Sequence, residues 1–91
     1  LLRAEATRQG WPIKFLSDVR RRLSATGSQL WGPVPAPMEK RAGRFRAQLL
    51  ILDKTRPQLA RTLKAVVAAA AESNLSPKVR WSIDVDPVDM S

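Results

Sequence analysis

The chain has 91 residues, enough for one small domain (1–91), and carries 16 Lys and Arg against 8 Asp and Glu, a net charge of +8. It has no Cys and no His, which excludes disulfides, the usual zinc sites and His-dependent catalytic triads, and is compatible with a reducing cytoplasm. No apolar run is long enough to span a membrane. The basic excess lies in residues 1–64, which indicates a polyanionic or acidic partner, or an ordinary solvated basic surface.

The first two predicted elements are a strand and a helix. Residues 1–7 are short and partly alternate in polarity, which predicts a strand. Trp11 and Pro12 then start a helix, because the missing N–H of proline costs nothing in a first turn. Apolar residues recur at helical spacing until the helix ends near Ala25, with Gly27 just beyond it.

A proline-rich segment follows at about residues 31–43. Three prolines within five residues exclude a central strand and predict a short or irregular edge strand at 30–36, with a turn at 39–43. Trp31, at the start of this segment, is either a lid over the margin of the core or an exposed anchor for a partner.

The second half predicts a strand, a helix and a last strand. Residues 44–52 alternate clearly, and so do residues 79–86. Thr55 is a suitable N-cap for a helix that holds Pro57 in its first turn. The apolar stripe of this helix comprises Leu59, Leu63, Val66, Val67 and Ala70. The strand residues expected to point inward comprise Phe45, Ala47, Leu49, Ile51, Val79, Trp81, Ile83 and Val85.

The order strand, helix, strand, strand, helix, strand predicts an α+β fold. Two interleaved strand–helix–strand halves with right-handed crossovers give a βαββαβ, split βαβ two-layer sandwich. Its four-stranded antiparallel sheet has both helices on one face. The other face is then left to solvent or a partner, and its predicted members are Arg44, Arg46, Gln48, Arg80 and Asp84.

Nothing in the chain predicts catalysis. There is no phosphate-binding loop of the G-x-x-x-x-G-K-[ST] type. Asp84 and Asp86 point the same way on one strand and could hold a divalent metal, but the sequence shows no third ligand, and neutralisation of nearby arginines is favoured. We therefore expect no enzyme activity from this chain by itself.

The open side of the predicted sheet is a candidate nucleic-acid surface. Arg44, Arg46 and Arg80 would contact phosphates there, or would dock on a neighbouring domain of a longer protein. Because periodicity turns Phe45 and Trp81 inward, the face should lack stacking platforms. It should then bind phosphates with little sequence preference and a steep salt dependence.

Two further basic features are weaker. Arg20, Arg21 and Arg22 surround one helical turn and are either secondary phosphate contacts or a solvated face. Arg56 opens the second predicted helix, where its guanidinium and free backbone N–H groups would suit a carboxylate or phosphate. An ion pair with Asp53 is the alternative for Arg56.

Three segments carry a family resemblance. They are G-P-V-P-A-P-M-E-K-R-A-G-R-F-R-A-Q-L-L-I at residues 32–51, R-W-S-I-D-V-D-P at 80–87 and L-L-R-A-E-A at 1–6. Together they resemble the C-terminal domain of the PriA family, the primosomal N′ helicases of bacterial replication restart, across essentially the whole chain.

The resemblance implies a parent 3′–5′ DNA helicase of the bacterial cytoplasm, whose ATP, Mg and Zn would be bound by domains upstream of this one. This domain would fold like a small-subunit ribosomal protein, help to bind branched or forked DNA, and contact the helicase lobes of its own chain. It would also border a pocket for the acidic C-terminal tail of single-stranded-DNA-binding protein. Arg56 matches the family arginine that takes the tail carboxylate, whereas Ala60 stands where some members have a companion glutamine.

Two other functions remain open from the sequence. One is a ribosome-associated protein that binds folded RNA through the same face. The other is an intramolecular scaffold whose sheet face packs on the helicase lobes.

Overall fold

The computed structural model describes residues 1–85 and contains four strands and two helices in the predicted order. Residue 86, the predicted end of the last strand, lies outside the described residues. The elements are β1 (Leu2–Ala6), α1 (Trp11–Arg22), β2 (Gln29–Arg41), β3 (Arg44–Leu52), α2 (Arg56–Glu72) and β4 (Arg80–Ile83), with short 3-10 turns at Ser24–Thr26 and Ser76–Lys78.

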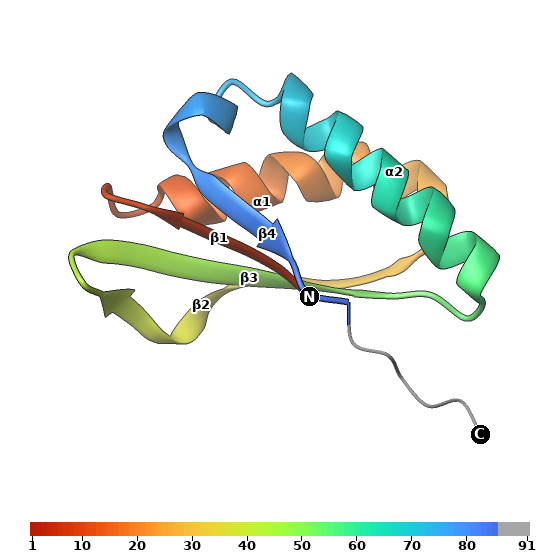
Figure 1. Ribbon diagram of the computed structural model, residues 1–91, viewed down its shortest axis with the longest axis horizontal. Helices are drawn as coiled ribbons and strands as arrows, with labels where there is room; N and C mark the ends of the chain where they lie inside the picture. The colour runs from red at the N-terminus through yellow and green to blue at the C-terminus, as the bar shows by residue number, and fades with distance from the viewer. Residues whose placement is uncertain (86–91) are drawn as a thin grey trace.

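The strands form one antiparallel sheet in the order β2-β3-β1-β4. Both helices lie on the same side of this sheet, so the molecule has two layers (Figure 1). The non-sequential order arises because β1 lies between β3 and β4, which interleaves the two strand–helix–strand halves. The predicted α+β fold is confirmed.

The core lies between the sheet and the helices. Its largest fully buried side chains are Leu2, Phe15, Leu16, Val19, Leu23, Leu49, Thr62 and Val66. Trp81 packs against this cluster, and its ring stacks on Phe15 with 6.5 Å between the centroids. Phe45 lies on the helix side of the sheet opposite buried Ala6, but at the hairpin end, where it stays half-buried and Lys40 Nζ lies 5.4 Å from its centroid.

The proline-rich segment forms a longer strand than predicted. β2 runs for 13 residues to Arg41, and only Ala42 and Gly43 form the turn. Prolines are tolerated because β2 is an edge strand, and register shifts between Trp31 and Val34 and again between Pro35 and Lys40 absorb the irregularity. The predicted strand at 30–36 was therefore too short, and the predicted turn at 39–43 was too long.

Two apolar residues are misplaced by the sequence pattern. Val67 is 53% exposed, and the inward face of α2 instead consists of Thr62, Val66, Ala69 and Ala70. The Thr62 hydroxyl can be buried because it donates to Gln58 O at 3.0 Å. Val85 is exposed because β4 ends at Ile83, after which the Asp84 N–H donates to Leu1 O at 2.9 Å.

Candidate nucleic-acid interface

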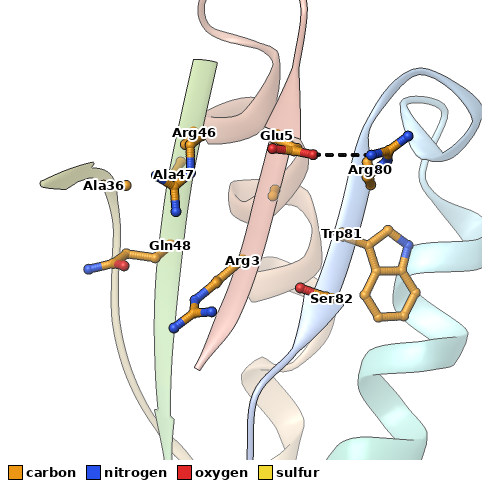
Figure 2. A pocket seen from close by; sticks show the side chains of 10 residues that line it. Arg3, Glu5, Ala36, Arg46, Ala47, Gln48, Arg80, Trp81 and Ser82 are labelled. Atoms are coloured by element: carbon orange, nitrogen blue, oxygen red, sulfur yellow. Dashed lines mark ion pairs between the residues drawn. The ribbon is translucent and has the colours of Figure 1, made fainter. Parts of the chain in front are cut away.

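The sheet surface turned away from the helices, here called the open face, carries charged side chains from three strands. Alternation places them there, because their neighbours along each strand point into the core. Figure 2 shows the polar side chains of three strands around a hollow of about 210 Å³: Arg3 and Glu5 from β1, Arg46 and Gln48 from β3, and Arg80 and Ser82 from β4.

Two arginines of the open face have acidic partners. Glu5 lies opposite Arg80 on β4, and Glu5 Oε1 is 3.6 Å from Arg80 Nη1 (Figure 2). Arg3 Nη2 is 3.2 Å from Asp84 Oδ2. Such exposed pairs contribute about 1 kcal/mol or less, so a phosphate can compete for both guanidinium groups.

The two arginines of β3 are not neutralised in this way. Arg46 lies opposite Glu5, yet neither Arg44 nor Arg46 has an ion pair or a side-chain hydrogen bond among residues 1–85. Both are half-buried, so they are more firmly placed than freely solvated side chains. Of the three predicted contact residues on the open face, Arg44 and Arg46 therefore offer uncompensated charge, and Arg80 offers shared charge.

The open face also has an apolar half, in which Trp31 and Val34 of β2 join Leu50 of β3, which the strand alternation had already turned outward. Trp31 pairs with Leu50 and Val34 pairs with Gln48, so all four side chains lie on the same side as Arg46. Trp31 is 62% exposed, so the prediction that it covers the core margin is wrong, and its role as an anchor for a partner stays a prediction. The only signal for its position is the strand register, which a single sequence does not reveal.

The arginines of α1 lie on another surface. Arg20 Nη1 donates to Gly32 O at the bend of β2, and Arg21 Nη2 donates to Asp18 Oδ1. Arg22 pairs with Asp18 Oδ1 at 3.5 Å and with Glu72 Oε2 at 2.9 Å, which ties α1 to α2. The structure thus separates these three residues from the open face and gives each one an internal partner.

A shallow groove beside α1 remains. It measures about 530 Å³ and is lined by Ser17, Arg20, Arg21, Ser24, Ser28, Leu30 and Pro33. Its polar lining could hold a phosphate, but both of its arginines are already engaged.

Arg56 is exposed at the start of α2 and has no ion pair among the described residues. The alternative of a pair with Asp53 is wrong, because Asp53 Oδ1 accepts a hydrogen bond from Ser28 Oγ at 2.6 Å and Oδ2 is buried without a partner among these residues. Thr55 caps the helix by accepting from the Gln58 N–H at 3.2 Å, and Pro57 has no N–H. The first turn therefore has fewer free N–H groups for an anion than the sequence suggested.

An apolar hollow lies one helical turn beyond Arg56. It measures about 160 Å³ and is lined by Leu1, Leu2, Leu50, Ile51, Leu52, Asp53, Leu59, Leu63, Ile83, Asp84 and Val85. Arg56 and Leu59 are three residues apart, which places them near one another on the surface of α2. A ligand with both a carboxylate and an apolar group could contact the two sites together.

Within residues 1–85, no group of three Asp, Glu, His or Cys side chains is arranged to hold a metal ion, and neither helix has the length and apolar character needed to cross a membrane. Asp84 of the D-x-D pair contacts Arg3, and Asp86 lies outside the described residues.

Comparison with known proteins gives one family. A family model described as the primosomal protein N C-terminal domain matches residues 1–88. The replication restart protein PriA of Haemophilus influenzae is 40% identical over 79 residues, which cover 87% of this chain and 10% of that relative. The chain therefore spans about a tenth of the length of the curated relative that it matches.

Proposed function

The chain belongs to the family of primosomal protein N C-terminal domains, and on that premise we propose that it is a non-catalytic DNA- and partner-binding domain in replication restart. Its ligand on this proposal is branched or forked DNA, bound by the open face. The observation that carries the proposal is the pair Arg44 and Arg46, two half-buried arginines on one strand with no acidic partner among the described residues. ATP, Mg and Zn would be bound by other parts of a helicase in the bacterial cytoplasm.

Physical chemistry favours a phosphate ligand on this surface. Arg44 and Arg46 are two residues apart on β3, so both guanidinium groups project from one side of the sheet, with Arg3 and Arg80 on neighbouring strands. Arginine forms bidentate hydrogen bonds with phosphate oxygens, and each phosphate that it neutralises releases a counterion. Contacts of this kind position DNA without reading its sequence.

Replacement of Arg44 and Arg46 by alanine is expected to weaken binding to forked DNA about tenfold or more and to flatten its salt dependence. Each lost phosphate contact should lower the slope of log affinity against log salt by about 1. Fluorescence anisotropy with a labelled fork, at salt concentrations from about 50 to 200 mM, measures both effects.

Arg61→Ala is the matched control, because Arg61 is an exposed arginine on α2, on the helix side of the molecule. Attraction by net charge alone would give Arg61→Ala about half of the double variant's loss in log affinity, because it removes one charge where the double variant removes two. A structured RNA tested in parallel addresses the RNA-binding alternative, which tighter binding of the RNA would support. Unchanged DNA binding by the double variant would instead favour packing of the open face on the helicase lobes.

A second proposed ligand is the acidic C-terminal tail of single-stranded-DNA-binding protein, placed at Arg56. The favouring observation is that Arg56 is exposed without an acidic partner among residues 1–85, one turn before the apolar hollow at Leu59 and Leu63. Arg56 would take the terminal carboxylate and the hollow would take the last side chain. Because Ala60 cannot donate a hydrogen bond as a glutamine would, we expect a weak site.

Arg56→Ala should therefore lower the affinity for a peptide ending in Asp-Phe-carboxylate about tenfold, since a charge-assisted hydrogen bond contributes about 1.5–3 kcal/mol. Titration calorimetry or a chemical-shift map measures this, and amidation of the peptide terminus should have a similar effect. Arg61→Ala, five residues further along the same helix, serves as the control. Equal affinities for the parent chain and Arg56→Ala would remove Arg56 from the site.

A further inference from the structure

We propose that Trp31 is a stacking platform for an unpaired base, so that the open face holds a single-stranded segment of DNA. This inference rests on the proposed function and adds a ligand class to it: unpaired nucleotides at the side of the face formed by β2 and β3. The arginines supply phosphate contacts, and Trp31 supplies the aromatic surface that the sequence alone did not place there.

Trp31 differs from the other two tryptophans of the chain. Trp11 packs against the core, with Arg8 Cζ and Lys78 Nζ at 5.3 and 5.4 Å from its ring centroid. Trp81 packs against the core and stacks on Phe15. Trp31 is 62% exposed and makes no such ring contact among residues 1–85, so a face of its indole is available.

The backbone of Trp31 is held by strand pairing, and its side chain is left exposed. Its strand, β2, pairs with β3, and Leu50 lies directly opposite Trp31. The next residue, Gly32, accepts a hydrogen bond from Arg20 Nη1, which fixes the bend of β2 to α1. Because the backbone is already ordered, a stacking base has to order only the side chain of Trp31 and not the strand that carries it.

The arginines beside Trp31 favour a nucleic acid over a purely apolar partner. Leu50 lies opposite Trp31 on β3. Every second residue from Leu50 toward the start of β3 lies on the same side of the sheet, and these residues are Gln48, Arg46 and Arg44. Leu50 and Arg46 are four residues apart, which is about 13 Å along a strand. A short run of unpaired nucleotides can therefore stack on Trp31 and place its phosphates at Arg46, whereas an apolar peptide would leave the guanidinium groups unmatched.

A base in the interior of a duplex has both faces covered by its neighbours and cannot stack on Trp31, which separates this inference from general phosphate binding. Base–aromatic stacking contributes about 1–3 kcal/mol per base, equivalent to about a 5-fold to 150-fold change in affinity. Trp31→Ala should therefore weaken binding of a single-stranded oligonucleotide by that factor while duplex binding changes less than about twofold. Trp31→Phe should retain part of the single-strand affinity.

The experiment measures affinities of the 91-residue chain for a labelled oligothymidine and for a blunt duplex of equal length, at one salt concentration. Met38→Ala is the matched control, because Met38 is an exposed apolar residue on the same strand. Fluorescence adds an independent readout: the oligonucleotide should quench tryptophan emission of the parent chain and quench it less in Trp31→Phe. Circular dichroism confirms that each variant is folded.

The outcomes separate the two proposals. If Trp31→Ala binds single strands as tightly as the parent chain, or loses duplex and single-strand affinity equally, Trp31 is no stacking platform, although the open face still binds DNA. If the parent chain binds neither form, the proposed function fails and this inference fails with it. A loss confined to the single strand, together with the change in quenching, supports both proposals.

Discussion

Leu49→Ala is expected to lower the free energy of unfolding by about 2–5 kcal/mol, because it removes a fully buried side chain from the centre of β3 and leaves a cavity. Leu50→Ala should cost about 1 kcal/mol or less, since Leu50 is 39% exposed on the open face. The two substitutions are chemically identical and adjacent. Their difference therefore reports which side of the sheet faces the helices.

Urea unfolding followed by circular dichroism measures both values, and an unchanged dependence on urea shows that the same surface is exposed on unfolding. The free energy of unfolding of a small domain is about 5–15 kcal/mol, so Leu49→Ala can leave little folded protein. Leu49→Val makes a smaller deletion at the same position and keeps the comparison measurable. Equal losses at the two positions, or a larger loss at Leu50, would mean that the open face has been assigned to the wrong side.

The sequence alone predicted the fold because β3 and the two helices have clear periods, although β2 does not. In β3 the alternation identifies Ala47 and Leu49 as buried and Arg46 as open, and the structure agrees. The N-cap at Thr55 also follows from local chemistry, and Thr55 does accept from Gln58 N–H. Such features depend on neighbours along the chain, so a single sequence carries them.

Features that depend on distant partners could not be predicted in this way. Thr62 reads as a polar residue, yet it is buried: its hydroxyl donates to Gln58 O within the same helix, and the Ser28 hydroxyl, 34 residues away, lies 3.0 Å from it. The same Ser28 hydroxyl donates to Asp53 Oδ1, whereas the closeness of Asp53 and Arg56 in the sequence had suggested an ion pair between those two residues. The Ser28 hydroxyl thus lies beside buried Thr62 on α2 and also binds Asp53, which leaves Arg56 without that carboxylate as a partner.

The position of Trp31 shows the same limit for the candidate site. Strand alternation could not place it, because the register of β2 shifts between Trp31 and Val34. Arg44 and Arg46 were placed correctly on the basis of periodicity, but whether they had acidic partners required the neighbouring strands. The sequence therefore identified the open face as basic. The structure identified Arg44 and Arg46 as the arginines without acidic partners among the described residues, and Trp31 as the exposed ring on the same face.

Gly32→Ala tests the bend that presents Trp31. Gly32 has φ of +111°, and an added Cβ would lie 3.1 Å from Gln48 O and from Val34 N, both of which are backbone atoms held by the sheet. Strained backbone and overpacking each cost about 1–3 kcal/mol. We therefore expect Gly32→Ala to lower the free energy of unfolding by about 2–5 kcal/mol.

Gly43→Ala separates these two costs. Gly43 also has a positive φ, +78°, but an added Cβ meets nothing within 4 Å, so only the conformational cost of about 1–2 kcal/mol applies. Urea unfolding of both variants gives the steric contribution at Gly32 as the difference, and equal values would show that the bend can widen freely. Because the Gly32 carbonyl accepts from Arg20 and Trp31 is its neighbour, the folded fraction of Gly32→Ala should also bind single-stranded DNA less well. Gly43→Ala, at the far end of the hairpin, should bind single-stranded DNA like the parent chain. A loss of binding in Gly32→Ala alone would show that the bend at Gly32 is needed to present Trp31 to this ligand.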